Sequence, residues 1–530
     1  MKSLFNKVAL LSFLVLLFMV SCQDNILDTD IDPVDNNLPS LSSLTNVDGL
    51  TTFAKGIYDF IASEDVFETV GVEKESPMLF FTYGYHETMG DVMTMPWGNF
   101  GGRWINQTES ITLDDASVIT PPAGGPQPGE IAIRNTRAAG SDNALQYEWR
   151  DMYSIIVQSN TILEALDNLP ADDVTKQAFN AWALWWRAYG YSRLGSMYEQ
   201  GVINDSGLIS NPTSAPSTEY ASNNELITKS NAILDDLETL LNNVSDASAF
   251  DTRFSNFQLA YLKEKVNLSE LLENINTLRV RNLVYNTKVA DMTTADWNQV
   301  ITLANNGVSA NSSAFTIESE TSFIDNNWLP GQVTGFWYFP SDRLIQDINT
   351  GDERLDRLFI QDADDGFPFP NPRGRGIQYG ASYFWQESSP LVSSTAQEVT
   401  MYYAGTHEEN QLFLAEAKVR TNDIEGGLAH LDAVRTLQES GLAATVGTGL
   451  TQDEALEEIR KERRLALLFR AVSFYDARRY GVAAGSRTGA HVLDQNGVLN
   501  TNATINYGYL EYWPVPAFES DFNPPSSTPN

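Results

Sequence analysis

Two segments of the chain read as long helices and are separated by only three residues. They cover 145–169 and 173–199, and the residues between them are Pro170-Ala171-Asp172. The proline ends the first segment, and an aspartate at 172 or 173 can cap the second. One face of the second segment is apolar and aromatic: Ala178, Trp182, Trp185 and Tyr189. Because so short a linker leaves the two helices as neighbours, the chain must build its core from packed helix pairs.

Helical periodicity extends over much of the remaining chain. From about residue 44, apolar residues recur at helical spacing: Leu50, Phe53, Ile57 and Ile61. Further helices are expected at 222–243, 254–274, 295–305, 409–421, 424–438 and 452–480. Paired helices of this size are typical of a tetratricopeptide-like solenoid. We therefore predict a mostly α fold in which about four tetratricopeptide-like helix pairs form a scaffold, with a long irregular loop-rich region and little β structure.

Two long stretches lack a helical period. Residues 76–144 and 309–400 are rich in glycine, proline and aromatic residues. Loops of this length are uncommon in compact proteins and are often functional. We therefore expect an N-terminal helical region at 44–308 that contains the first stretch as a loop insertion. A C-terminal region at 309–530 would contain the second stretch, 309–400, and helices at 409–480.

The N-terminus carries an export signal that does not belong to the fold. Lys2 and Lys7 precede a short apolar run, and the only cysteine of the chain, Cys22, follows that run. Residues 19–22 resemble the cleavage box of a bacterial lipoprotein. We expect 1–21 to be removed, Cys22 to carry the acyl chains of an outer-membrane anchor, and 22–43 to be an acidic tether. The alternative is a plain signal peptide with an incidental cysteine.

The composition excludes several classes of function. The chain has 34 basic and 69 acidic side chains and a formal net charge of −35, which makes nucleic acid a poor partner. One cysteine excludes a disulfide framework and zinc sites built from several cysteines. The four histidines have no ligand spacing, and there is neither a Gly-Lys-Ser/Thr phosphate loop nor a Gly-x-Ser-x-Gly elbow. We expect no enzyme, no metal site and no cofactor, although sequence alone does not exclude the paired carboxylates of a glycoside hydrolase.

The C-terminal motifs resemble those of a known family. Residues 462–470 read Glu-Arg-Arg-Leu-Ala-Leu-Leu-Phe-Arg, and 474–481 read Phe-Tyr-Asp-Ala-Arg-Arg-Tyr-Gly. With the repeat at 409–437, Arg-Ala-Tyr-Gly-Tyr at 187–191 and Tyr-Trp-Pro-Val-Pro at 512–516, they look like the SusD/RagB family. That family comprises surface lipoproteins of glycan-uptake systems in Bacteroidetes. Together with the lipoprotein signal at the N-terminus, these motifs extend the resemblance over essentially the whole chain.

Two residues in the predicted helix 452–480 depart from the family pattern. Arg470 stands where glutamate is more usual, and Ala471 replaces the glycine that follows it. Because we place both in a structural helix, they cast little doubt on function. Glu462 and the two arginines after it could be catalytic, but an ion-pair network between packed helices is the preferred interpretation.

The tryptophans divide into two groups. Six lie in helical patterns predicted to be core or in the closing motif: Trp149, Trp182, Trp185, Trp186, Trp297 and Trp513. The other five lie in the irregular stretches, where a large ring either packs locally or meets a ligand. Indole stacks on the C–H face of a sugar, and amides and arginines bind its hydroxyls. We predict these ligand-binding residues: Trp97, Asn99, Arg103, Trp104, Trp328, Trp337, Tyr338 and Trp385.

The family resemblance implies a specific role. A protein of this kind captures oligo- or polysaccharide at the cell surface, without turnover, and delivers it to a partner SusC-like TonB-dependent transporter in the outer membrane. The family often binds glycan near the positions that 97–99 and 328–338 occupy here. Two alternatives remain open from the residues: a tetratricopeptide-type scaffold that binds peptides or proteins, and a glycoside hydrolase.

Overall fold

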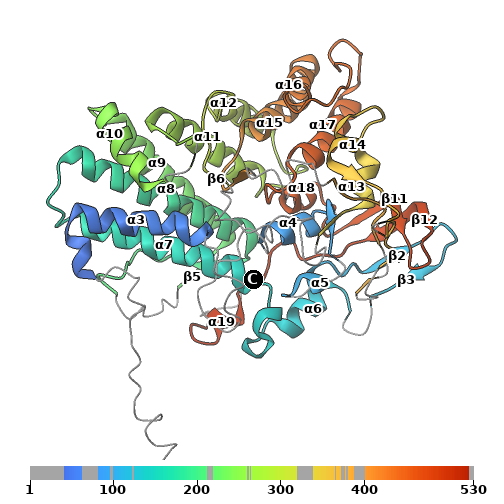
Figure 1. Cartoon of the computed structure of the whole chain (residues 1–530), viewed down its shortest axis with the longest axis horizontal. Coiled ribbons are helices and arrows are strands. Elements are labelled where there is room, and N and C mark those ends of the chain that lie inside the picture. Colours follow the sequence, from blue (N-terminus) through green and yellow to red (C-terminus); the bar gives the residue numbers. More distant parts are fainter. Residues whose placement is uncertain are drawn as a thin grey trace, which may run out of the picture.

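Helices dominate the described part of the chain (Figure 1). Consecutive helices pack side by side, α7 with α8, α8 with α9, α11 with α12, and α15 with both α12 and α16. The mostly α fold with little β structure is thereby confirmed. The computed structural model describes residues 41–62, 82–95, 100–121, 125–211, 219–258, 262, 264–318, 338–364, 366–371, 376–377, 380–386 and 400–524.

The scaffold helices follow one another from the left of Figure 1 across its top. They are η1 (Leu41–Thr45), α3 (Val47–Ala62), α7 (Gln146–Leu166), α8 (Asp173–Met197), α9 (Asn223–Asn242), α10 (Ala247–Phe254), η4 (Ser255–Phe257), α11 (Leu268–Val284), α12 (Thr294–Ala304), α15 (His407–Arg420), α16 (Ile424–Leu437), α17 (Gln452–Ala466) and α18 (Ser473–Arg479). Shorter helices lie between them: α4 (Tyr83–Met89), α5 (Gly102–Ile105), α6 (Gln127–Arg134), η3 (Arg137–Asp142), α13 (Asp342–Asp347), α14 (Arg354–Leu358) and α19 (Ala517–Ser520).

The aromatic face of α8 forms the centre of the core. Trp182, Trp185 and Trp186 are fully buried, and Trp185 stacks on Phe315 with ring centroids 4.5 Å apart. The indole N–H of Trp182 donates to the carbonyl of Ala54 at 2.9 Å, which ties α8 to α3. Because a buried N–H needs a partner, this bond fixes the orientation of the ring. The prediction that the helical tryptophans are core residues is confirmed, since Trp149 and Trp297 are buried as well.

The single helix predicted at 254–274 is wrong. Helix α10 ends at Phe254, and α11 begins only at Leu268. The side chain of Asn267 accepts from the backbone N–H of Glu270 at 3.1 Å, and Glu270 accepts from the N–H of Asn267 at 2.9 Å. This reciprocal capping box starts a new helix. Within the predicted span, α10 contributes only its last residue, Ser255–Phe257 form the 3-10 helix η4, and α-helix resumes at Leu268.

The single helix predicted at 452–480 is also wrong. It is divided into α17 and α18, and Phe469 and Ala471 between them have φ of 58° and 54°. This left-handed backbone cannot continue an α-helix and suits glycine best. Ala471 therefore lies in the break between two helices, and the glycine usual in the family would fit there without strain.

The ion-pair interpretation of Glu462 is confirmed. Its carboxylate accepts from Arg354 at 2.5 Å and from Arg435 at 3.0 Å, and all three side chains are buried. The pairs join α17 to α14 and α16. A carboxylate held by two guanidinium groups in the interior stabilises helix packing and is closed to a substrate.

A small antiparallel sheet closes the right-hand side of Figure 1, with strand order β11-β12-β2-β3. The hairpin β11–β12 was not among the predicted elements. The sheet joins 110–119 from the first irregular stretch to the C-terminal hairpin at 486–506. The strands are β1 (Met93–Thr94), β2 (Ser110–Thr112), β3 (Val118–Ile119), β4 (Gln200–Val202), β5 (Tyr220–Ser222), β6 (Thr316–Glu318), β7 (Phe339–Pro340), β8 (Phe359–Ile360), β9 (Phe384–Trp385), β10 (Thr400–Tyr402), β11 (Ser486–Leu493) and β12 (Leu499–Asn506).

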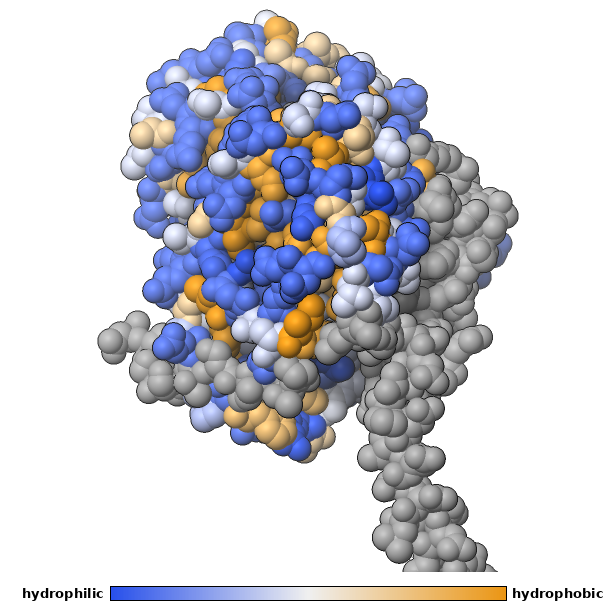
Figure 2. Space-filling model, turned by 90° about the vertical axis from the view of Figure 1, so that its left-hand side faces the viewer, coloured by the Kyte–Doolittle hydropathy of each residue, from blue (hydrophilic) through white to orange (hydrophobic). Residues whose placement is uncertain are grey.

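The outer side of the scaffold is mainly polar. Figure 2 shows the left-hand side of Figure 1, where hydrophilic side chains predominate and apolar side chains reach the surface in a band between them. Of the helices in the part of the chain that the structure describes, none is long and apolar enough to cross a membrane.

Candidate functional site

A short antiparallel ribbon joins the two irregular stretches of the chain. Strand β1 comes from the first stretch and β7 from the second, and Thr94 lies opposite Phe339. Because the two strands are antiparallel, Met95 and Tyr338 lie at the same end of the ribbon. Two segments more than 200 residues apart in sequence are thus brought together at this end of the ribbon. We call the end marked by Met95 and Tyr338 the open end of the ribbon.

Two glycines let the open end pack closely against neighbouring helices. Gly102, in α5, lies against the thioether of Met95, and Gly84, in α4, lies against the ring of Tyr338. A Cβ at either glycine would overlap these side chains, so any larger residue would displace them. The close packing therefore fixes the positions at which the two segments begin.

Trp104 lies on α5, close to the open end, and is partly exposed. The guanidinium carbon of Arg103 lies 4.1 Å from the ring centroid, and that of Arg134 lies 3.4 Å from it. Cations at this distance are attracted by the indole ring. The ring therefore supports two arginines, whose N–H groups are donors suited to hydroxyl oxygens.

Arg134 comes from a helix that the sequence did not predict. The segment 76–144 was read as irregular, but it contains α4 and α6. Arg134 pairs with Glu130 one turn earlier, and burial raises the pKa of the Glu130 carboxyl even with that partner. Acid and arginine four residues apart are a recognisable helix signal, and it could have revealed both α6 and this second arginine.

The structure places the predicted ligand-binding residues in three groups. Arg103 and Trp104 are partly exposed beside the open end. Tyr338 and Trp385 lie inside the protein. Four others, Trp97, Asn99, Trp328 and Trp337, lie outside the described residues, as does Cys22.

Tyr338 and Trp385 were predicted to bind ligand, and their burial contradicts that prediction. Their exposed fractions are 0% and 1%, so neither ring offers a face to a ligand. The indole N–H of Trp385 donates to the backbone carbonyl of Tyr338 at 2.8 Å, and its ring packs against Phe359 and Phe469. Both residues support the ribbon from within and are not part of its surface.

Comparison with known proteins agrees with the C-terminal motifs. Residues 409–525 match the model of the SusD family. The C-terminal region of the chain is therefore similar to the SusD family. No curated protein matches the chain.

The fold of the chain is shared with solved structures of low sequence identity. One is a SusD-like carbohydrate binding protein from Bacteroides fragilis NCTC 9343, with 14% identity and a TM-score of 0.58, covering 91% of this chain and 99% of that one. A SusD-like carbohydrate binding protein from Bacteroides vulgatus ATCC 8482 has 13% identity and a TM-score of 0.54, covering 90% and 96%. A SusD homolog from Bacteroides thetaiotaomicron VPI-5482 has 14% identity and a TM-score of 0.55, covering 91% and 97%.

Proposed function

We propose that this chain is a carbohydrate-binding protein of the cell surface, held by a lipid on Cys22, that passes glycan to a TonB-dependent transporter without hydrolysing it. Two of the solved structures that share its fold are described as carbohydrate binding proteins. The family match supports the same class of function.

One observation carries the proposal within this chain. The pairing of Thr94 with Phe339 brings together the two aromatic-rich stretches that the sequence selects as binding segments. Trp97 follows β1 by three residues, and Trp337 precedes β7 by two. The glycan face proposed here consists of these two tryptophans with Asn99, Trp328 and the Arg103–Trp104 pair.

Affinity electrophoresis against a panel of polysaccharides tests the proposal. Residues 23–530 should be retarded by at least one glycan, and Trp97→Ala or Trp337→Ala should weaken that binding at least tenfold, about 1.4 kcal/mol. Trp104→Ala should weaken glycan binding less, because Arg103 and Arg134 already lie over the Trp104 ring and the ring would act only by holding these two donors in place.

A matched control removes an exposed apolar side chain from the scaffold. Leu437, at the end of α16, has an exposed fraction of 54%, and Leu437→Ala should leave retardation unchanged. Absence of retardation by every glycan, or equal binding by wild type and both tryptophan variants, contradicts the proposal. Release of reducing ends from a glycan would favour a hydrolase instead.

The anchor and the partner need separate measurements. Cys22→Ser should move the protein from the membrane fraction to the soluble fraction of cells, since the acyl chains would have no attachment site. A TonB-dependent transporter should copurify with the wild-type protein from detergent-solubilised outer membranes.

A further inference from the structure

A charged cavity lies at the other end of the β1–β7 ribbon. Its volume is about 440 Å³, which is in the range of small-ligand pockets. Asp91, just before β1, and Asp347, at the end of α13, belong to its wall, and α17, α18 and β11 supply most of the rest. Neither the glycan face nor any residue predicted from the sequence to bind ligand lines this cavity.

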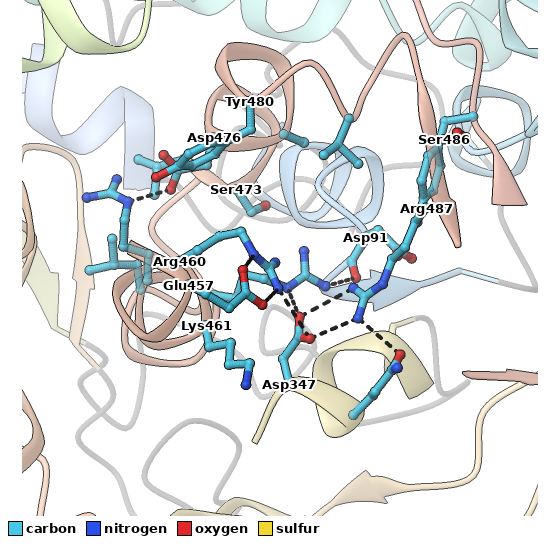
Figure 3. A pocket seen from close by; sticks show the side chains of 18 of the residues that line it. Asp91, Asp347, Glu457, Arg460, Lys461, Ser473, Asp476, Tyr480, Ser486 and Arg487 are labelled. Atoms are coloured by element: carbon cyan, nitrogen blue, oxygen red, sulfur yellow. Dashed lines mark hydrogen bonds and ion pairs between the residues drawn. The ribbon is translucent and has the colours of Figure 1, made fainter. Parts of the chain in front are cut away.

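Three arginines from two elements converge on one carboxylate in this cavity. Asp347 is paired with Arg464 at 2.7 Å, Arg487 at 2.8 Å and Arg460 at 3.5 Å. Figure 3 shows Arg460 and Arg487 reaching toward Asp347 from opposite sides, one from α17 and the other from β11. One carboxylate cannot neutralise three guanidinium groups, so this group of four side chains carries a net charge of +2.

The other acids of the wall reduce this excess without removing it, because the whole lining has four acids, Asp91, Asp347, Glu457 and Asp476, and five cations, Arg460, Lys461, Arg463, Arg464 and Arg487. Glu457 pairs with Arg460 at 2.7 Å, and its side chain is 48% exposed, so solvent screens this pair. Lys461, also in the wall, adds a further cation. Burial lowers the pKa of the Arg464 guanidinium, and Arg487 and Arg460 lower it further, although Asp347 and Asp91 act to raise it. The cations are therefore close enough to destabilise one another.

Arg463 also belongs to the lining of the cavity. Arg463 is 2% exposed, and it donates through Nε to Asp476 at 2.9 Å and through Nη2 to the hydroxyl of Tyr285 at 3.0 Å. Its Nη1 is buried and has no hydrogen-bond partner among the residues that the structure describes. A buried guanidinium N–H without a partner is unfavourable and gains from an oxygen ligand.

We propose that this cavity binds the oxyanion group of a small ligand, a carboxylate, sulfate or phosphate, between Arg460, Arg464 and Arg487. Guanidinium groups match such oxyanions in a two-pronged geometry, and an anion would neutralise the excess charge around Asp347. Such an oxyanion group can belong to an acidic sugar, or it can be the inorganic ion itself. This proposal does not depend on glycan binding at the open end.

Calorimetric titration of residues 23–530 at low salt tests it with four probes: glucuronate, glucose, inorganic sulfate and inorganic phosphate. At least one of the three anions should bind saturably, and glucose should not bind in the cavity. Tighter binding of glucuronate than of the inorganic ions identifies the ligand as an acidic sugar, and the reverse order identifies it as the ion. Failure of all three anions to bind overturns the proposal.

Two substitutions should shift the affinity in opposite directions. Arg460→Gln removes a cation from the wall and should weaken binding at least fivefold. Glu457→Gln removes the acid that competes for Arg460 and should tighten binding two- to fivefold. Both side chains are partly exposed, so the fold should persist, and thermal unfolding checks this. An ion-pair network with a structural role alone predicts no tightening, so unchanged or weaker binding by Glu457→Gln contradicts the proposal.

The matched controls carry the same substitutions outside the cavity. Arg279→Gln breaks ion pairs with Asp235 and Glu238, and Glu439→Gln breaks the pair with Arg357. Both should leave anion affinity unchanged. Equal effects of Arg279→Gln and Arg460→Gln would show that overall charge, and not this cavity, governs binding.

Discussion

The buried carboxyl of Glu87 should make the stability of the fold depend on pH near neutrality. Glu87 lies on α4 and is fully buried, and its Oε1 accepts from the backbone N–H of Ala471 at 3.1 Å. Burial raises the pKa of Glu87 from 4.5 to about 8, although Ser473, the N–H of Ala471, Arg470 and Arg464 act to lower it. The carboxyl is therefore protonated at neutral pH in the folded protein and ionised in the unfolded chain.

The sign and size of this pH dependence of stability follow from proton linkage. A carboxyl with a raised folded pKa stabilises the fold fully below pH 4.5, and this stabilisation falls as the pH rises toward 8. Between pH 5 and pH 7 the loss is about 2.5 kcal/mol, because each pKa unit corresponds to about 1.4 kcal/mol. Glu87→Gln keeps the shape of the side chain and cannot ionise, so it should lack this component.

Urea unfolding of both proteins between pH 5 and pH 8 measures the effect. Other groups titrate in both proteins, so the relevant quantity is the free energy of unfolding of wild type minus that of Glu87→Gln. This difference should fall by about 2.5 kcal/mol from pH 5 to pH 7. Parallel curves for the two proteins would refute the reasoning, because they would mean that Glu87 is ionised at the same pH in the folded and unfolded states.

Three further substitutions test the packing, each by urea unfolding. Gly84→Ala should lower the free energy of unfolding by about 1–3 kcal/mol and weaken glycan binding, because its methyl group would displace Tyr338. Ala471→Gly should raise it by about 0.5 kcal/mol, because relief of a left-handed alanine outweighs the added flexibility of glycine. Glu462→Gln should lower it by about 3 kcal/mol, because it removes a buried carboxylate from two buried arginines.

The scaffold could be predicted from sequence because its signals are local. The aromatic face of α8 and the Asp172 cap both lie within one helix and its first turn, and both are present in the structure. The β11–β12 hairpin also has a local signal, an Asn496-Gly497 pair between two segments of strand length. This hairpin could therefore have been predicted from the sequence.

The helix break at Ala471 and the burial of Trp385 were not predicted, because they depend on contacts between distant parts of the chain. The break at Ala471 depends on tertiary contacts, since its backbone N–H donates to Glu87, nearly 400 residues away. Trp385 looked like a loop tryptophan, and only the packing of Phe359 and Phe469 around its ring shows that it is core. Periodicity in sequence does not record such contacts, so both the helix break and the burial of this ring required the structure.

The resemblance to the SusD family was recognisable because the C-terminal motifs consist of ion-pairing residues in fixed order. Arg479 pairs with Glu416 and Asp476, and Arg463 pairs with Asp476, so both of these arginines have a partner in the core. The residues proposed to bind glycan form no comparable motif in the sequence. Sequence therefore identifies the scaffold more sharply than it identifies the ligand.

Salt should separate the two proposed binding sites. Glycan binding at the open end depends on aromatic stacking and hydrogen bonds to neutral hydroxyls, which ionic screening hardly changes. Anion binding near Asp347 depends on an excess of cations within a protein of net charge −35, so it should weaken strongly as screening increases. Raising NaCl from about 0.02 to 0.5 M, which shortens the screening length from roughly 20 Å to about 4 Å, should reduce anion affinity at least tenfold and change glycan affinity less than twofold. Equal salt dependence of the two affinities would mean that both ligands occupy one charged site, and the separation of the two ends of the ribbon would then have no functional meaning.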